Sequence, residues 1–525
     1  MPRIRDDRPE TGDALTDAAL DALDADELRA LIRELLPWFD DRLHARFVNA
    51  VIDHAARNPS GWVPAAPGEA IVAEIERFAD AAQRIGYADP AEVDAWLRVG
   101  SNAFLARDYA AAYRIFHALL IPLADAAFDI GQHEMVDEVL GIEVGDCAAQ
   151  YAVAVYMTAA ARHRGRAVLA AFDAVGGVWH FAAPLRELEQ AAVESLPGVD
   201  DFLLRWREAV AARVAQRGPS DWANQEDRWL HEVVLRIDGP EGLGEIARAT
   251  CRLHDLRAWC EALAAAGDWS AALAANEAAV ECLADRPDAC AEFLDGAALA
   301  VQQLRGEDLP ERLDRAWRAS PSLPRLQRWL GSSETPQRMR ERVTQALAVC
   351  PEPALRQRAL LHLLADDPAA GATLLAGAPG LGWSNPEHPG PLLFPLFTAW
   401  LGDGESPDGM ADADEISSPP AGHDAPRLVT PALSELVALS GVMSSIDPTV
   451  RETLIAAMRR AAEQRIAGVT KNSRRRHYGH AASLALTCAR VDRSVEAAAW
   501  LAAVRQSYRR YPALQREFQQ REDAG

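Results

Sequence analysis

The spacing of apolar residues is the feature that most limits what this chain of 525 residues can form. Between residues 15 and 39 they recur every three or four positions, the period of an α-helix and not the alternation of a half-buried strand. The strong helix formers alanine, leucine, glutamate and arginine dominate the chain. The residues on this first stripe are Leu20, Leu23, Leu28, Leu31, Ile32, Leu35 and Leu36.

Capping residues followed by proline mark where helices begin. Asp89 can cap a helix, Pro90 suits its first position, and Glu92 suits its third. Each such pair predicts a new helix after a tight break, as in stacked antiparallel helices. The same signal recurs at Thr335-Pro336, Asp367-Pro368 and Asp447-Pro448.

Strand signals are almost missing from the sequence. The run GGVWHFAAP, residues 176–184, is short and apolar, but it lies between glycines and a proline. We expect a loop between helices there, with aromatic anchors, and an all-α fold for the chain.

Composition divides the chain further. Residues 402–427 are rich in Gly, Pro, Ser and Asp and hold almost no large apolar side chain, which predicts a flexible acidic linker. The predicted segments are a disordered tail at 1–13, an N-terminal helical domain at 14–215, a middle helical-repeat domain at 216–401, the linker at 402–427, and a C-terminal helical domain at 428–525.

Residues 90–122 carry the spacing of a helical hairpin. Trp96 and Gly100 lie one turn apart on the first helix, Tyr109 lies in the turn, and Ala112 and Phe116 lie one turn apart on the second helix. Small residues where two helices cross let the backbones approach, and the aromatic rings fill the remaining space. This pattern resembles a tetratricopeptide unit.

A second match lies at residues 256–280, and a degraded third at 480–504. In the second, Trp259 lies on the first helix, Gly267 and Trp269 form the turn, and Ala272 lies on the second helix. The matches do not recur at a constant period, so the resemblance implies an irregular, tetratricopeptide-like α-solenoid of antiparallel helix pairs. Generic helical hairpins remain the alternative, because alanine-rich pairs reproduce parts of the pattern.

The two ends of the chain, 21–36 and 474–518, resemble the helical regions of bacterial SWIM zinc-finger proteins. The SWIM finger requires a C-x-C pair, and this sequence has none. The resemblance therefore implies a helical array only, without the zinc or a nucleic-acid role of the finger.

Charge and residue usage exclude several functional classes. The net charge of −23 disfavours bulk attraction to nucleic acid or anionic lipid, so a basic or an apolar partner fits better. Lys471 is the only lysine, as in proteins of GC-rich bacteria, and its context is not that of a P-loop. The seven cysteines contain no C-x-x-C pair, and neither a secretory signal nor an apolar run long enough for a membrane span is evident. We expect a cytoplasmic protein with reduced thiols and no cofactor.

One weak metal motif is present. His133, Glu134 and Asp137 resemble the zinc motif H-E-x-x-H with its second histidine replaced by aspartate. A metal-dependent enzyme is thus one alternative, although a solvated acidic helix face explains the same residues. Cys251-x-x-His254 lacks a second ligand pair at zinc spacing, and buried structural cysteines explain it better.

One basic segment interrupts the acidic chain. It could contact an acidic partner or RNA, or pair with the linker carboxylates of Asp412, Asp414 and Glu415. We expect partner or internal pairing rather than nucleic acid, which remains the second alternative. The candidate contact residues are Arg474, Arg475, Arg476, His477 and Tyr478.

The sequence contains no G-x-S-x-G elbow, no Gly-rich dinucleotide loop and no strong catalytic motif. With its helical pairs, this predicts a scaffold or accessory subunit that binds one or more proteins and has no catalysis of its own.

Overall fold

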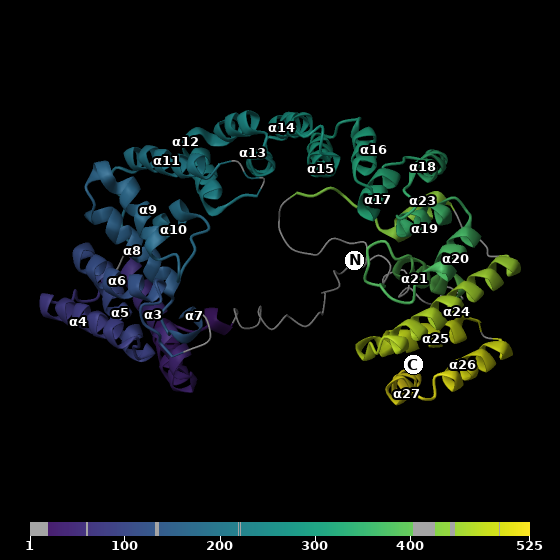
Figure 1. The fold of residues 1–525 in the computed structure, drawn as a ribbon, viewed down its shortest axis with the longest axis horizontal. Coiled ribbons are helices and arrows are strands. Elements are labelled where there is room, and N and C mark those ends of the chain that lie inside the picture. The colour runs from purple at the N-terminus through teal and green to yellow at the C-terminus, as the bar shows by residue number, and fades with distance from the viewer. Residues whose placement is uncertain are drawn as a thin grey trace, which may run out of the picture. The chain divides into compact units, whose positions relative to one another are not determined.

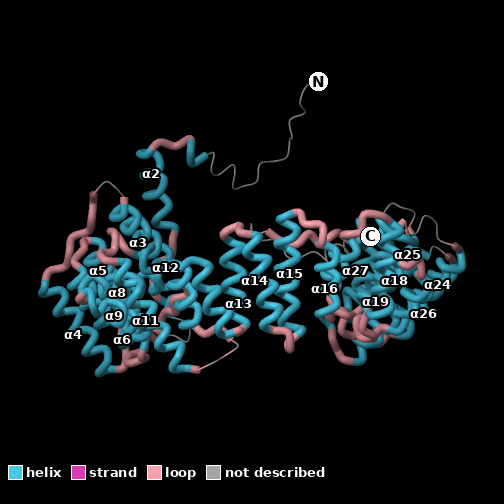
Figure 2. The backbone as a smooth tube through the Cα atoms, turned by 90° about the horizontal axis from the view of Figure 1, so that it is seen from above, coloured by secondary structure: helices cyan, strands magenta, loops and turns pink. Residues whose placement is uncertain are grey.

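The structure, a computed structural model, describes residues 19–58, 61–131, 136–218, 220, 222–402, 426–441, 447–492 and 494–524. Within these residues all regular structure is helical, and one isolated bridge joins the backbones of Tyr87 and Asp129 (Figures 1 and 2). Residues 175–183 form turns and loop between two helices, as predicted for the apolar run. The predicted all-α fold class is confirmed.

Contacts group the chain into two compact units, residues 1–243 and 244–525. The division falls within helix α12 (Gln225–Thr250), which is kinked at Gly239, where φ is 69°. This grouping is coarser than the segments predicted from the sequence, which remain predictions. The predicted tail lies outside the described residues, as does nearly all of the predicted linker.

The first unit is a succession of helices in which neighbours along the chain also pack together. Its cores lie between α5 and α6, between α6 and α8, and between α9 and α11. Before α12 its α-helices are α2 (Ala25–Leu35), α3 (Asp41–Arg57), α4 (Glu69–Ile85), α5 (Pro90–Leu105), α6 (Tyr109–Ala124), α7 (Val136–Val139), α8 (Val144–Thr158), α9 (Arg164–Ala174), α10 (Pro184–Ala191) and α11 (Val199–Arg217).

The second unit begins with four helices stacked in chain order, which lie side by side in both views (Figures 1 and 2). These are α13 (Leu253–Ala265), α14 (Trp269–Cys282), α15 (Pro287–Leu304) and α16 (Leu309–Ala319). The stack continues through α17 (Leu323–Gly331), α18 (Pro336–Val349), α19 (Leu355–Leu364), α20 (Pro368–Gly377) and α21 (Gly390–Leu401). The unit ends with α23 (Leu433–Ser440), α24 (Pro448–Lys471), the 3₁₀ turn η3 (Arg475–His477), α25 (Tyr478–Asp492), α26 (Val495–Ser507) and α27 (Pro512–Ala524).

A single apolar core runs through most of the second unit. It joins residues before the predicted linker, such as Phe397 of α21, to residues after it, such as Met458 of α24 and Phe518 of α27. The helices on both sides of residues 402–427 therefore share one hydrophobic interior.

Capping side chains lie at the helix starts that the sequence predicts. Asp89, Thr335, Asp367 and Asp447 each accept a backbone N–H from the first turn, at 2.9, 3.2, 3.0 and 2.7 Å respectively. A proline occupies an early helical position after each of them, where its missing N–H leaves no hydrogen bond unmade. The four predicted helix starts are confirmed.

The predicted hairpin at residues 90–122 is formed by α5 and α6. Gly100 is buried at their crossing, and Ala112 and Phe116 are fully buried. Trp96 is half-buried and packs against Phe78 of α4, with ring centroids 6.3 Å apart. The hydroxyl of Tyr109 donates to Glu194 at 2.8 Å.

The second hairpin, α13 and α14, repeats this arrangement. Trp259 and Ala272 are buried, and Trp269, at the start of α14, is half-buried. Gly267 takes a left-handed conformation in the turn, with φ at 73°. Asp268 then caps α14 by accepting the N–H of Ala271, as Asp108 does for Ala111 in the first hairpin. Helical hairpins thus repeat along both units.

In the part of the chain that the structure describes, none of the helices is both long and apolar enough to cross a bilayer.

Candidate functional site

The acidic motif at residues 133–137 lies mostly outside the described residues. His133 and Glu134 are not among them, and the side chain of Asp137, on the short helix α7, is not described. A metal site there remains a prediction.

The basic segment lies between α24 and α25. Arg474, Arg475 and Arg476 are exposed, and no carboxylate among the described residues forms an ion pair with them. His477 is half-buried and accepts a hydrogen bond from the Nε of Arg476 at 3.2 Å. Desolvation and the neighbouring cationic guanidinium groups lower the pKa of His477.

Tyr478, by contrast, is only 4% exposed and belongs to the apolar core of the second unit. Its ring is therefore not part of the surface formed by the exposed arginines, because the first turn of α25 packs inward. The linker carboxylates suggested as internal partners, Asp412, Asp414 and Glu415, lie outside the described residues.

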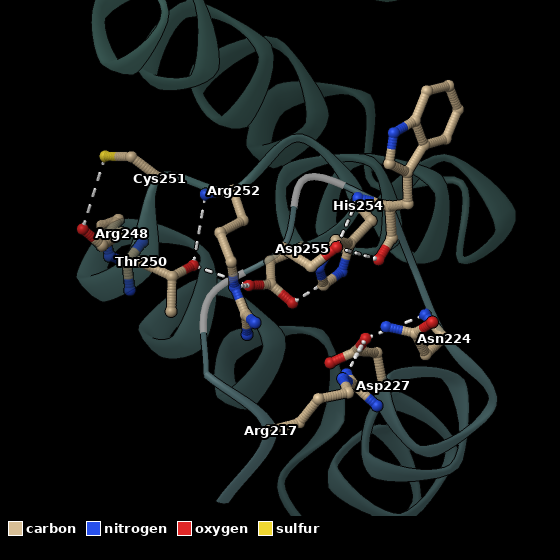
Figure 3. Close-up of polar contacts among 11 residues, drawn as sticks. Arg217, Asn224, Asp227, Arg248, Thr250, Cys251, Arg252, His254 and Asp255 are labelled. Atoms are coloured by element: carbon tan, nitrogen blue, oxygen red, sulfur yellow. Dashed lines mark hydrogen bonds and ion pairs between the residues drawn. The ribbon is translucent and has the colours of Figure 1, made fainter. Parts of the chain in front are cut away.

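Cys251 and His254 have separate partners near the start of α13. The Cys251 thiol faces the carbonyl of Arg248 at 3.8 Å, whereas His254 lies 3.2 Å from the carboxylate of Asp255 (Figure 3). Asp255 is buried and also accepts hydrogen bonds from Thr250 at 2.6 Å and Arg252 at 2.8 Å (Figure 3). This network ties the end of α12 to the start of α13.

The first unit contains a hollow that the sequence did not indicate. Two cavities, about 340 and about 500 Å³ in volume, share four lining residues, Asp53, Glu143, Asp146 and Gln150. We refer to the two together as the α8 cavity. Its other polar and aromatic lining residues include Arg46, Asn49 and Arg57 of α3, Arg98 and Ser101 of α5, Trp179, and Glu187 and Gln190 of α10.

Two glycines allow the segments that form the walls of the α8 cavity to pack closely together. A methyl group on Gly141 would lie 2.7 Å from the Cβ of Ala45, so the loop before α8 can press directly against α3. The same loop is tied to α5, because the N–H of Ile142 donates to Asp94 at 2.6 Å. A methyl group on Gly145 would lie 2.8 Å from the ring of Trp179, so this ring can lie against the first turn of α8.

Hydrogen bonds hold the Trp179 wall in place. The indole Nε1 donates to Glu187 at 3.2 Å. The other oxygen of Glu187 accepts the N–H of Ala183 at 2.9 Å, just before α10. One side chain therefore fixes both the ring and the start of the helix behind it.

Each arginine on the cavity wall has a partner within the protein. Arg98 lies 3.2 Å from Asp53, and Arg46 lies 3.1 Å from Glu143. Arg57 donates to the carbonyls of Gln190 and Ala191 at 3.0 and 2.9 Å, at the negative end of the α10 dipole.

Two acceptors on the wall have no such partner. The carboxylate of Asp146 forms no hydrogen bond or ion pair with the described residues. Its pKa is raised, mainly by desolvation and to a smaller extent by the negative charges of Asp53 and Glu143. Asp146 keeps part of its surface in water, so this effect is attenuated by solvent. Gln150 is 2% exposed, and its Oε1 receives no hydrogen bond.

The cavity wall suits binding rather than covalent chemistry. Its thiol, Cys147, is 1% exposed, and burial raises its pKa well above the ordinary range. The thiol is therefore protonated and a poor nucleophile at neutral pH.

Sequence reasoning missed this site because its residues come from helices more than a hundred positions apart. One local signal was present: Gly141, Glu143, Gly145 and Asp146 alternate small residues with carboxylates just where α8 begins. Such a pattern indicates close backbone packing next to charged side chains, but it does not show which residues of other helices complete the site.

Comparison with known proteins identifies no family. No protein-family model matches the chain, and no curated protein matches its sequence. Among solved structures, it is similar to a circular tandem repeat protein with a novel repeat topology and enhanced subunit contact surfaces, at 14% sequence identity and a TM-score of 0.16. The match covers 93% of this chain and 99% of the other. A superposition of this quality establishes no shared arrangement, so the fold class rests on the helices themselves.

Proposed function

We propose that this chain is a helical-repeat protein that binds another protein, and that the α8 cavity receives a segment of that partner. The helical hairpins α5–α6 and α13–α14 support tetratricopeptide-like units as the framework, because Gly100 lies at the first crossing, Gly267 lies in the second turn, and an aspartate caps the second helix of each pair. Arrays of this kind present concave surfaces on which other chains dock.

One observation carries the proposal. Asp146 and the buried Gln150 line the same cavity, and neither Asp146 nor the Oε1 of Gln150 has a donor within the described protein. The side chain of Asp146 is exposed where it lines the cavity, so a donor carried by a partner can reach its carboxylate.

The experiment blocks the cavity from its rim. Ala50 lines the cavity and is exposed, so Ala50→Trp adds bulk there without disturbing a buried side chain. Ala91→Trp is the control, because Ala91 is exposed on α5 and does not line the cavity. Tagged full-length variants are purified from the native host, and each stoichiometric partner is then made separately and titrated against them.

We expect a partner that binds the original chain and Ala91→Trp equally, and Ala50→Trp at least ten times more weakly. Equal binding by all three would show that the partner uses another surface. If no partner assembles with the original chain at all, the proposed function is wrong.

A second candidate function rests on Arg474, Arg475 and Arg476, which are exposed and unpaired among the described residues. Association with nucleic acid through them would weaken steeply with salt. Arg474→Glu with Arg476→Glu should then abolish binding to an RNA or DNA oligonucleotide, whereas Arg340→Glu with Arg460→Glu, two exposed sites on α18 and α24, should not. Binding that ignores the first pair would reject this function.

A further inference from the structure

The start of α25 gathers positive charge in a chain whose net charge is −23. Arg474, Arg475 and Arg476 are exposed there, and none of them forms an ion pair with a carboxylate of the described residues. They precede a 15-residue helix, whose dipole adds positive charge at this end. Because α25 packs against both α24 and α27 (Figure 1), side chains of these two helices contribute to the same region.

His477 lies among these charges. Its Nε2 accepts a hydrogen bond from the Nε of Arg476 at 3.2 Å. Desolvation lowers the pKa of His477, and the guanidinium groups of Arg465, Arg476 and Arg474 lower it further. All the charges that act on this imidazole are therefore positive, and two of them belong to exposed side chains that a ligand can reach.

Two more basic side chains come from the first turns of α25 and from α27. His480 is exposed, and its ring lies 4.9 Å from that of Trp383. The guanidinium of Arg521 lies against α25, since a methyl group on Gly479 would fall 2.5 Å from its Nη2. One carboxylate is near: Glu517 lies 3.6 Å from the Nε of Arg521. We refer to Arg474, Arg476, His477, His480 and Arg521 as the α25 surface.

A buried arginine lies behind the α25 surface. Arg465 of α24 is 4% exposed, and its Nη1 donates to the carbonyl of Gly380 at 3.2 Å. Its guanidinium lies over the ring of Trp383, 6.0 Å from the centroid. Desolvation lowers the pKa of Arg465, and no described carboxylate opposes this effect.

The charge of Arg465 acts on the surface without being part of it. It lowers the pKa of both His477 and His480, so its field reaches their rings. Buried charges in folded proteins are normally paired with an opposite charge. An anion bound at the α25 surface would supply this counter-charge from outside, with no need to touch the buried guanidinium.

The compactness of the α25 surface indicates which kind of anion fits. Its side chains gather around His477, whereas a nucleic-acid backbone needs a track of contacts to successive phosphates. The net charge of −23 also repels a long polyanion. A phosphate monoester concentrates about −1.5 to −2 charges on three strong acceptor oxygens at neutral pH. Guanidinium groups bind such oxygens in pairs.

We propose that the α25 surface binds the phosphate group of a monoester, held by Arg474 and Arg476 beside His477. Arg521 and His480 border the bound group, and Arg465 attracts it from beneath. A phosphorylated side chain of a partner protein and a free phosphorylated metabolite share this chemistry, and the test separates them. The inference goes beyond the proposed function, since it uses no residue of the α8 cavity.

The test uses defined phosphate compounds. Nα-acetyl-phosphoserine methylamide is titrated by calorimetry into the purified full-length protein at neutral pH and physiological ionic strength. Nα-acetyl-serine methylamide, glucose 6-phosphate and a single-stranded DNA oligonucleotide are titrated in parallel. We expect the phosphoserine compound to bind and the serine compound not to bind. Tighter binding of the phosphoserine compound than of glucose 6-phosphate would assign the site to a phosphorylated side chain, and the reverse order to a metabolite.

Variants locate the binding. Arg474→Gln and Arg476→Gln should each weaken binding of the phosphate monoester about tenfold, because each removes a charge-assisted hydrogen bond. The matched control is Arg340→Gln with Arg460→Gln, which removes two exposed arginines of α18 and α24 and should leave binding unchanged.

The bound phosphate should also raise the pKa of His477 by about one pH unit, because it opposes the charges of Arg465, Arg474 and Arg476. NMR of ring-labelled histidines measures this pKa, and His477→Gln identifies the signal. A phosphate bound elsewhere on the protein would leave the pKa of His477 where it was.

The inference is wrong if neither monoester binds, if the serine compound binds as well as its phosphorylated form, or if binding survives both Arg474→Gln and Arg476→Gln. It is also wrong if the oligonucleotide binds more tightly than both monoesters, because the ligand is then nucleic acid. The proposed function fails separately: a partner displaced by Ala50→Trp can be found whether or not a phosphate monoester binds.

Discussion

Phe116 of α6 lies so close to Gly100 of α5 that a methyl group on Gly100 would fall 2.9 Å from the phenyl ring. The side chain of Ile115 would lie equally near. The crossing of these two helices therefore depends on the missing side chain at one position.

Gly100→Ala should lower the free energy of unfolding by about 1–3 kcal/mol, because overpacking at the crossing exceeds the gain in helix propensity of roughly 1 kcal/mol. Gly377→Ala is the matched control, since Gly377 lies in α20 with no atom near the added methyl group. We expect this control to be neutral or slightly stabilising. Thermal and urea unfolding measure both changes, and a stable Gly100→Ala protein would show that the helices can separate without loss.

The two hairpin turns use a left-handed residue in different ways. Gly267 has φ at 73° and Arg107 has φ at 63°, but only glycine adopts this conformation without strain. Gly267→Ala should therefore destabilise the protein by about 1–2 kcal/mol. Arg107→Gly should be neutral or slightly stabilising, because its ion pair with Glu194 is long, at 3.7 Å, and largely exposed. Unfolding midpoints that shift in the same direction would contradict this reading of the turns.

Asp146 should make the first unit less stable as the pH rises through the mildly acidic range. Its pKa is raised in the folded protein, so the folded state binds more protons than the unfolded state between the unfolded value, near 3.8, and the raised one. The facing groups are Asp53 and Arg57 of α3, Arg98 of α5, and Glu143 beside α8.

Asp146→Asn should remove this part of the pH dependence and leave the protein more stable than the original chain at neutral pH. Unfolding midpoints measured between pH 3.5 and 7 test it, with Glu74→Gln as the control. If the unfolding midpoint of Asp146→Asn keeps the full pH dependence of the original chain, the folded protein does not raise the pKa of Asp146.

His480 should give the second unit the opposite pH dependence of stability. Desolvation and nearby cations lower its pKa to about 4, so the unfolded state binds more protons between pH 4 and the ordinary value of 6.5. Part of the His480 side chain stays in water, which attenuates this effect. Stability should therefore rise with pH across this window. The groups that face it are Arg465, His477, Arg521 and His388, and its ring lies 4.9 Å from that of Trp383.

His480→Gln should flatten this rise, which can be followed in unfolding midpoints between pH 4 and 7. His44→Gln, on α3 of the first unit and exposed, serves as the control. The buried His388 also has a lowered pKa and should leave a residual slope. A slope that is unchanged by His480→Gln would assign the dependence to other groups.

Residue spacing was enough to predict the helices, their caps and their hairpins. These depend on interactions between residues three or four positions apart, so the Asp89, Asp367 and Asp447 caps and the Gly100–Phe116 crossing could be recognised from spacing alone. Apolar periodicity shows which face of a helix is buried, but it does not show which other helix covers that face.

Which polar groups lack a partner became evident only from contacts between distant segments of the folded chain. The α8 cavity brings Asp53, Asp146 and Trp179 together from distant segments, and the buried Gln150 lines the same cavity. In the same way, Tyr478 follows three exposed arginines in the sequence, yet its ring lies in the core, because α25 packs against α24 and α27. The partners of buried polar groups and their electrostatic environment arise from contacts across the chain, which local spacing does not specify.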